Sequence, residues 1–196
     1  GDKVTTESYD PKGAKKVLED AGWVDTDGDG IREKDGKKLV VKWLTYPTRQ
    51  ELPLLAEAAQ ASLKEIGIEV DINNTLDVNE VVQDASAWDV YAMANVQAPT
   101  GDPEYWFRVF ALSDSAKNQG KYSNAQLDAL DEQLSQEFDT AKRADLAVQM
   151  QQILLDDNAF VFCSFLKMSM ISRSNVSNYT SHACDYYQIT ADLDIE

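Results

Sequence analysis

The segment Asp25–Gly30 carries the most conspicuous group of metal-binding side chains in the sequence, three aspartates at alternate positions. Carboxylates at this spacing open a calcium loop of the EF-hand type, in which oxygen ligands converge on a hard cation. The twelfth position counted from Asp25 is Gly36, where such a loop requires a bidentate glutamate. Asp25, Asp27 and Asp29 are therefore candidate calcium ligands, and a solvated Asp/Gly turn is the structural alternative.

Residue patterns of known enzyme classes are missing from the sequence. His182, the only histidine, lies near Cys184 and Asp185, which are ligand types for a metal but too few for a closed site. No Gly-x-Ser-x-Gly elbow, P-loop or Gly-x-Gly-x-x-Gly fingerprint occurs. We therefore expect no enzyme, and a hydrolase that uses His182 is the weakest alternative. Cys163 and Cys184 are either free thiols or a disulfide pair.

Two loops that follow expected strands carry both aromatic and polar side chains, Tyr46–Arg49 and Gln97–Trp106. In open α/β sheets, ligands bind at the carboxyl ends of strands and at the N-termini of helices. Core packing is the alternative role for each aromatic side chain. The two loops therefore predict one wall of a ligand-binding cleft.

The elements that would position these loops alternate between helix and strand. Asp10 and Pro11 are typical of an N-cap and a first helical residue, and Gly22 ends that helix. Strands over Leu39–Tyr46 and Ile68–Ile72 with a helix over Leu54–Ile66 between them form a βαβ unit, so the strands should be parallel. The other expected elements are a helix from Asp77 to Ala85, a strand over Trp88–Val96, a helix over Pro103–Leu112, helices capped by Ser123 and Thr140, and one or two strands over Phe160–Ile171.

Composition narrows the class of protein. The chain has 196 residues, of which 43% are apolar and 27% are charged, as in ordinary globular domains rather than disordered or collagen-like chains. We expect one α/β unit over residues 1–196. Its 34 acidic and 18 basic residues give a net charge of −16, which argues against nucleic acid and anionic membranes as partners. Strong net charge also favours a monomer.

An ordered set of short motifs resembles the family 5 extracellular solute-binding proteins, the peptide and nickel receptors of ABC importers. The segment Asp25–Leu39 is similar to a hairpin insertion that several members carry, and we expect Asp25–Asp35 to be dispensable for transport. The matching motifs, in chain order, are Tyr9-Asp10-Pro11, Ala21-Gly22-Trp23, Leu63–Val70, Trp88-Asp89-Val90, Gly101-Asp102-Pro103, Tyr122-Ser123-Asn124 and Ala141–Leu154.

The resemblance implies a lobe of the type II periplasmic-binding-protein fold, a mixed sheet flanked by helices. In that family two lobes close over a small solute, and the closed form is recognised by a membrane permease. The chain would then be the C-terminal lobe alone, without the N-terminal lobe that precedes the Tyr-Asp-Pro motif. The family works outside the cytoplasmic membrane, in the periplasm or as lipoproteins of the cell surface. The polar start of the chain contains no signal peptide, which would belong to the absent lobe.

Within this lobe, five residues are expected to contact the solute: Tyr46, Arg49, Thr100, Asp102 and Trp106. If the strands that precede the two loops are parallel, both loops lie at one edge of the sheet. A helix beginning at Pro103 would direct its free amides towards that edge and favour an anionic ligand group. Arg49 offers a planar donor fork for a carboxylate, and Asp102 is also a candidate N-cap.

The expected solute is an oligopeptide, a nickel chelate or a similar small molecule. Peptide-binding members commonly place an aspartate three residues before the acid of the Asp-Pro pair, where this chain has Pro99. The segment Ala98–Pro103 looks closer to the loop of nickel-type receptors, although Ser113–Gln119 lacks the histidine that such relatives place there. A calcium-binding structural or adhesion module, built on Asp25–Gly30, is the alternative from a different functional class.

Overall fold

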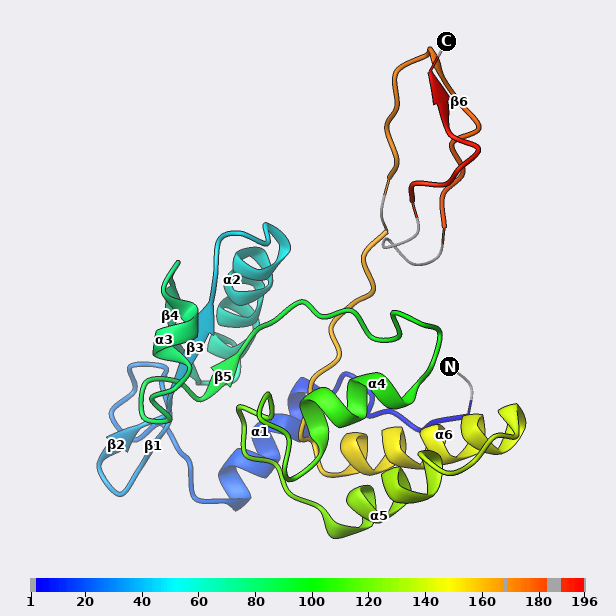
Figure 1. Cartoon of the computed structure of the whole chain (residues 1–196). Coiled ribbons are helices and arrows are strands. Elements are labelled where there is room, and N and C mark those ends of the chain that lie inside the picture. The colour runs from blue at the N-terminus through cyan, green and yellow to red at the C-terminus, as the bar shows by residue number, and fades with distance from the viewer. Residues whose placement is uncertain (1–2, 168, 183–187, 196) are drawn as a thin grey trace. The chain divides into compact units, whose positions relative to one another are not determined.

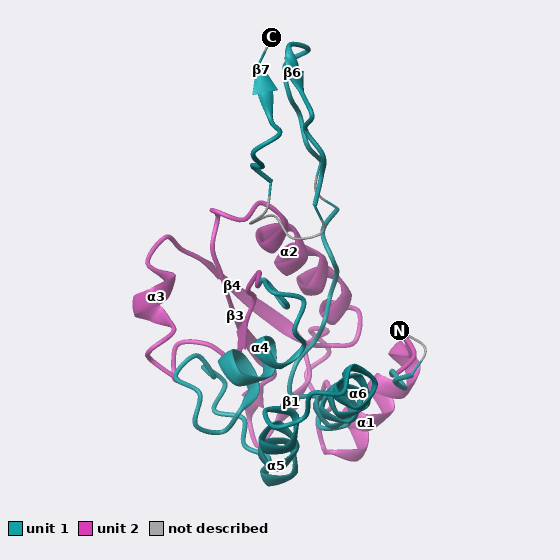
Figure 2. Ribbon diagram, turned by 45° about the vertical axis from the view of Figure 1, so that its right-hand side comes forward, with its two compact units in different colours: residues 1–6, 96–196 teal, residues 7–95 magenta. Residues whose placement is uncertain are grey.

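The computed structural model describes residues 3–167, 169–182 and 188–195 (Figure 1). The chain divides into two compact units, unit 1 with residues 1–6 and 96–196, and unit 2 with Glu7–Asn95 (Figure 2). Each unit holds its own set of buried apolar side chains. The expectation of a single lobe over residues 1–196 stays a prediction. None of the described helices combines the length and apolar character that crossing a membrane requires.

Unit 2 is built around a three-stranded parallel sheet in the order β4-β3-β5. The expected βαβ unit is confirmed, since β3 and β4 pair in parallel on either side of α2. Leu44 of β3 is fully buried and packs with Val78 and Val82. The elements of unit 2 are α1 (Pro11–Asp20), β1 (Glu33–Lys34), β2 (Lys37–Lys38), β3 (Val40–Thr45), α2 (Glu51–Lys64), β4 (Glu69–Asn74), α3 (Val78–Val81) and β5 (Val90–Tyr91).

Three boundaries in unit 2 differ from the sequence-based prediction. The third strand is β5 alone rather than Trp88–Val96, in part because the amide of Ala94 donates to the Tyr46 hydroxyl (3.3 Å) instead of to a strand. The helix after Asp77 ends at Val81, and the Asp77 side chain makes no capping hydrogen bond. Helix α2 begins at Glu51 because its proline lies in the first turn, where a missing N–H is tolerated.

Unit 1 is helical in its centre and extended towards the C-terminus (Figure 1). Leu127, Leu130 and Leu134 of α5 are buried, as are Met150 and Leu154 of α6, and the two helices pack together. The elements are α4 (Glu104–Trp106), the π-helix η1 (Phe107–Ala111), α5 (Ala125–Leu134), α6 (Thr140–Asp156), β6 (Val176–Ser177) and β7 (Asp194–Ile195). The antiparallel pair β6–β7 lies in the C-terminal tail, where the sequence predicts no element.

The helix caps of unit 1 lie one residue from their predicted positions. Asn124, not Ser123, caps α5, because its side-chain oxygen accepts from the amides of Gln126 (2.9 Å) and Leu127 (3.1 Å). Asp139, not Thr140, caps α6 through the amide of Lys142 (3.0 Å). In both places two neighbouring polar residues could cap the helix, and the amide or carboxylate side chain makes the capping bond rather than the hydroxyl side chain.

One prediction of regular structure in unit 1 is confirmed in extent but not in kind, and another was wrong. The helix expected over Pro103–Leu112 runs over Glu104–Ala111, as three residues of α4 followed by the wider π-helical turn η1. The strands expected over Phe160–Ile171 are absent from the described part of this segment, which has an extended chain without a ladder. Val161, Phe165 and Ile171 are 86%, 79% and 93% exposed, so apolar sequence alone does not form a strand without a partner.

A buried arginine, Arg32, directly precedes the β1–β2 hairpin and binds α1 and the turns that follow α1 and α2. Arg32 is only 9% exposed. Its Nη1 donates to the Trp23 carbonyl (2.8 Å), its Nε to the Ile66 carbonyl (2.8 Å) and its Nη2 to Glu19 (3.0 Å). The two carbonyl groups lie in the turns that follow α1 and α2, outside both helices. Gly67 has a φ of +87°, and a Cβ at this position would lie 2.7 Å from the Arg32 side chain, so glycine is required here.

The acidic loop that precedes Arg32 is closed at its base. Val24 and Glu33 exchange both backbone hydrogen bonds, at 3.1 and 2.8 Å. The β1–β2 hairpin turns at Asp35 and Gly36, both with positive φ, as a two-residue hairpin turn requires. The hairpin predicted here is confirmed. That Asp25–Asp35 is dispensable for transport stays a prediction, and this stretch includes the buried Arg32.

We expect Arg32→Ala to lower the free energy of unfolding by about 3 kcal/mol, because it leaves two carbonyl groups and a carboxylate without their buried donor. Denaturant unfolding of the purified protein measures this change. Lys37→Ala, at an exposed position of the same hairpin, is the matched control and should change stability by less than about 0.5 kcal/mol. Equal effects of the two substitutions would contradict the role of Arg32.

Candidate functional site

The five predicted contact residues belong to both units. Tyr46 and Arg49 follow β3 in unit 2, whereas Thr100, Asp102 and Trp106 lie in and after the 97–103 loop of unit 1. The structure places each group within its own unit, and their joint contact with one ligand stays a prediction.

The unit 2 group lies at the carboxyl end of β3. The Tyr46 ring is half-buried against Tyr91, with ring centroids 6.5 Å apart, and its hydroxyl accepts from the Ala94 amide. This bond connects the segments that follow β3 and β5, as expected for parallel strands whose carboxyl ends share an edge. Arg49 is exposed, in the loop that leads into α2.

Two polar residues at the same edge were missed by the sequence-based prediction. Thr45, the last residue of β3, is fully buried, and its Oγ1 has no hydrogen-bond partner among the described residues. Oε1 of Glu51, the first residue of α2, is likewise buried and unpaired within the described chain. Buried polar atoms without partners are rare in folded proteins. Both residues directly flank the loop 46–50, so the sequence could have indicated them as further polar residues of this loop.

In unit 1, the 97–103 loop contains Asp102, whose carboxylate accepts hydrogen bonds from other residues of this unit. Gly101 has a φ of +80°, and its amide donates to the Ala98 carbonyl (2.9 Å). Asp102 accepts from the Glu104 amide (2.9 Å), which supports the predicted capping role, although Pro103 is the formal N-cap. The anion site expected at this helix start stays a prediction, and the Glu104 amide there already donates to Asp102.

Trp106 lies inside an aromatic cluster rather than on an open surface. It is 9% exposed. Its ring centroid lies 5.0 Å from that of Phe160, 5.5 Å from Phe162, 5.8 Å from Phe107 and 6.0 Å from Phe110. These separations are typical of packed aromatic pairs. Trp106 therefore contributes to the core of unit 1, and its contact with a ligand stays a prediction.

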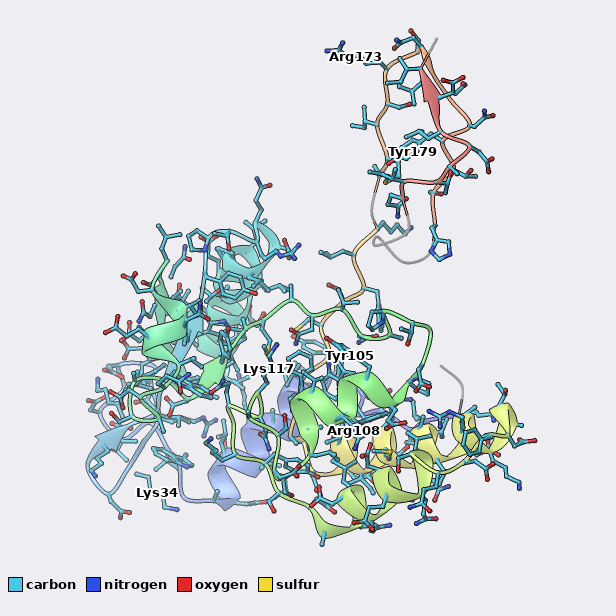
Figure 3. All side chains as sticks on the ribbon, viewed as in Figure 1. Lys34, Tyr105, Arg108, Lys117, Arg173 and Tyr179 are labelled. Carbon is cyan, nitrogen blue, oxygen red and sulfur yellow. The ribbon has the colours of Figure 1, made fainter. Side chains whose placement is uncertain are left out.

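Five charged side chains form a network between α4, η1, α5 and α6. Nη2 of Arg143 donates to both carboxylate oxygens of Asp102 (2.8 Å each) and to Glu104 (3.2 Å), and these bonds raise the pKa of Arg143. On η1, Arg108 binds Glu104 (2.9 Å) and lies 3.7 Å from Asp131 (Figure 3). Glu104 thus joins the two arginines.

Asp131 of α5 is the strained member of this network. Its residue is 4% exposed, and its Oδ1 has no hydrogen-bond partner among the described residues. Burial raises the pKa of Asp131 to about 6, against the opposing effect of Arg108 and with further increases from Glu104, Asp128 and Asp114. The ionised form of Asp131 therefore costs the folded protein free energy at neutral pH.

The Tyr-Ser-Asn motif has a structural role. Tyr122 Oη donates to Asp157 at the end of α6 (2.5 Å), and the Asn124 amide donates to the same oxygen (2.9 Å). Burial, followed by this bond, raises the pKa of Tyr122 to about 12. Nearby, the buried Asn118 holds the 113–122 loop through its bonds with Leu112 and Tyr122. The motif thus fixes the start of α5 against the end of α6.

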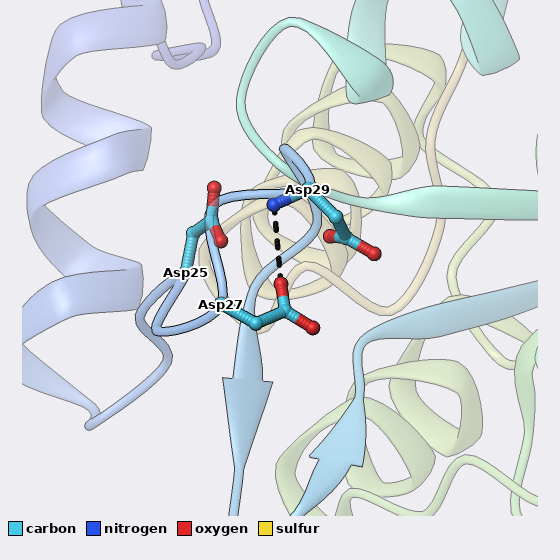
Figure 4. A group of neighbouring side chains, drawn as sticks. All are labelled: Asp25, Asp27 and Asp29. Carbon is cyan, nitrogen blue, oxygen red and sulfur yellow. Dashed lines mark hydrogen bonds between the residues drawn. The ribbon is translucent and has the colours of Figure 1, made fainter.

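The three aspartates of the acidic loop lie together and are exposed (Figure 4), with one carboxylate oxygen from each within 4.8 Å of the others. Both Asp25 oxygens accept from the loop backbone, at the amides of Gly28 (2.7 Å) and Gly30 (2.9 Å). The Lys38 ammonium donates to Asp29, and this bond lowers the pKa of Asp29. These contacts fit the Asp/Gly turn, and calcium binding stays a prediction.

The other candidate ligands form no cluster within the described chain. Cys184 and Asp185 lie outside the described residues, so the disulfide and the three-residue metal site are not tested. His182 exchanges backbone bonds with the Gln188 side chain, at 3.4 Å each. Cys163 is exposed.

We expect Asp131→Asn to stabilise the protein above pH 6. The folded-state pKa of about 6 exceeds the ordinary value of 3.8, so the folded protein binds the proton more tightly, and stability falls as pH rises through this window. Melting temperatures measured from pH 3 to 8 should show a gain of a few degrees at pH 7.5 that shrinks as the pH falls from about 6 and vanishes below 3.8. Glu132→Gln, at the exposed neighbouring position, is the control. An equal gain at every pH would contradict the assignment.

Comparison with known proteins places these units in context. The profile described as "Bacterial extracellular solute-binding proteins, family 5 Middle" matches residues 1–118. The nickel-binding protein NikA of Staphylococcus aureus is 29% identical over 87% of this chain and 34% of its own length. The oligopeptide-binding protein AppA of Bacillus subtilis is 30% identical over 89% of this chain and 32% of its own. The chain thus spans about a third of the length of these relatives.

Solved structures agree on the fold. A nickel ABC transporter protein of Bacillus halodurans superposes with a TM-score of 0.74 and 27% identity, covering 98% of this chain and 40% of its own. AppA of Bacillus subtilis, solved with a nonapeptide, superposes with a TM-score of 0.67 and 28% identity over 79% of this chain and 32% of its own. The expected α/β fold of the type II binding-protein class is confirmed. The chain belongs to the family 5 bacterial extracellular solute-binding proteins.

Proposed function

We propose that this chain is the C-terminal lobe of an ABC-importer receptor, which captures a small solute outside the cytoplasmic membrane and delivers it to a membrane permease. The family match over residues 1–118 carries the proposal. A second lobe, outside this sequence, would close over the solute, and closure would be the signal to the permease. The receptor would act as a monomer in the periplasm or at the cell surface and catalyse no reaction.

The carboxyl end of β3 is the part of the lobe that supports solute contact best. The exposed Arg49 presents a guanidinium that pairs in a planar, two-bond geometry with a carboxylate. Thr45 Oγ1 and Glu51 Oε1 lie buried beside this loop and have no partner in the described chain, so they do not reach a solute in this conformation. A solute with a carboxylate would pair with Arg49. Amino acids, peptides and their metal chelates have this chemistry.

The names of the relatives support two of the proposed solutes, a nickel chelate and a peptide. Pro99 stands where a peptide receptor would have a carboxylate for the amino terminus. A chelate that carries its own ligands needs no histidine from the protein. Tyr46, Arg49, Thr100 and Trp106 stay the proposed contacts, and Asp102 is the fifth residue of the expected set.

We expect Arg49→Ala to weaken solute binding about tenfold or more without changing the melting temperature, since Arg49 is exposed. The solute is first identified by mass spectrometry of small molecules released from the intact purified protein, and affinity is then measured by calorimetry. Trp106→Ala is the contrasting variant, expected to cost about 3 kcal/mol of stability because the aromatic cluster loses its central ring. Unchanged affinity in Arg49→Ala would overturn this contact, and the absence of any released or bound solute would overturn the function.

Calcium binding by Asp25, Asp27 and Asp29 is the second proposal, favoured by the approach of their oxygens to within 4.8 Å. A bound cation would have to displace the Lys38 ammonium from Asp29. We expect Lys38→Ala to strengthen the site, because it removes the competing charge. Melting curves with calcium or with a chelator test this expectation in the wild type, in Lys38→Ala and in Asp27→Asn. No calcium-dependent shift in Lys38→Ala would exclude the calcium module.

A further inference from the structure

We propose that Arg143 positions the 97–103 loop for the solute, and that Asp102 is the anchor of this loop rather than a charged partner of the solute. This inference rests on the proposed function for its last step, solute binding. Its structural step, the attachment of the loop to α6, rests on the contacts of unit 1 alone.

Arg143 uses both ends of its guanidinium within unit 1. Nη2 binds both oxygens of Asp102 and one of Glu104, at 2.8, 2.8 and 3.2 Å. Nη1 donates to the carbonyl groups of Leu134 (2.5 Å) and Glu137 (2.8 Å). The Arg143 side chain is 17% exposed, so these bonds are partly shielded from water. A charge-assisted pair in such surroundings is stronger than an exposed one.

The carboxylate of Asp102 is already committed. Oδ1 accepts from Arg143 and from the Glu104 amide, and Oδ2 accepts from Arg143. The Asp102 side chain is 43% exposed, but three of its roughly four acceptor positions are taken and its charge is already paired with Arg143. A cationic solute group would have to share this carboxylate with the guanidinium. Asp102 is therefore poorly suited to select a peptide amino terminus.

The loop itself depends on this attachment. The hydrogen bond from the Gly101 amide to the Ala98 carbonyl stays inside the loop, and Gly101 adopts a conformation that other residues rarely hold. Asp102 connects the end of the loop to α6. With that connection, Thr100 and the backbone before it are presented in one conformation, which lowers the entropy cost of binding.

Arg143 also has a structural role, which the experiment has to separate. Leu134 is the last residue of α5, and a cation beside the carbonyl groups at and after this end stabilises the helix. Loss of Arg143 thus affects the α5–α6 turn as well as the loop. Asp102 contacts the Nη2 side of the guanidinium and also accepts from the Glu104 amide. Asp102→Ala therefore removes the loop contact and this cap but leaves the bonds of Arg143 Nη1 to α5 and the turn after it in place. Exchange of the Glu104 amide is left out of the comparison.

The experiment compares Asp102→Ala, Arg143→Gln and the double variant in the intact protein that contains this chain. Hydrogen exchange of residues 97–103 is measured by mass spectrometry without solute, and affinity is measured by calorimetry with nickel(II)–L-histidine and with a pool of nonapeptides. We expect both single variants to speed loop exchange at least about tenfold and to weaken binding equally. The double variant should be no worse than either. Arg143→Gln alone should also lower the melting temperature.

Arg108→Gln is the matched control, since Arg108 binds Glu104 but not Asp102, and it should leave loop exchange unchanged. Unchanged exchange in both single variants would overturn the anchor. So would a loss of affinity in Asp102→Ala that adds to that of Arg143→Gln, because Asp102 would then contact the solute directly. If the wild type binds neither probe, the proposed function fails for these solutes, whereas the exchange rates still decide whether Arg143 holds the loop.

Discussion

A guanidinium group held against the C-terminal ends of helices is the constraint on which both units depend. A helix ends with carbonyl groups that have no partner inside the helix, and a short loop rarely supplies enough donors. Arg143 binds the carbonyl of Leu134, the last residue of α5, and Arg32 binds the carbonyls of Trp23 and Ile66 in the turns that follow α1 and α2. The rigid fork of an arginine reaches acceptors on two sides at once, which the single ammonium of a lysine does not. Each unit thus uses one side chain to hold the backbone where it leaves a helix.

This use of arginine has a consequence for the balance of charge. The chain carries a net charge of −16, so each cation placed inside leaves the surface more acidic. Arg143 and Arg108 face the carboxylates of Asp102, Glu104 and Asp131, a set in which acids outnumber bases. Burial, which Arg108 opposes and to which Glu104 adds, raises the pKa of Asp131. The network connects the helices, and it includes one carboxylate, that of Asp131, whose ionised form is destabilised by burial.

Local patterns predicted the local structure well. The Asp-Pro start of α1 and the alternating β4 were evident in the sequence, because caps and periodicity depend on neighbouring residues. The bonds of Arg32 and Arg143 were not, since their partners are separated along the chain by up to 41 residues. Trp106 illustrates the same limit at the candidate site. Its aromatic neighbours include Phe160, which no spacing rule connects to a helix start.

The paired backbone of Val24 and Glu33 has a practical meaning for comparison with relatives and for engineering. Arg32 lies between the two residues of this pair, whereas the six residues from Asp25 to Gly30 are exposed and hydrogen-bond within the loop and to the β1–β2 hairpin. The length of this side branch is therefore not set by the rest of unit 2. Gaps in alignments of this segment are expected to fall between Asp25 and Gly30. The same branch is a suitable place to insert an affinity tag or a fluorescent reporter domain, because the residues on either side of it maintain the fold.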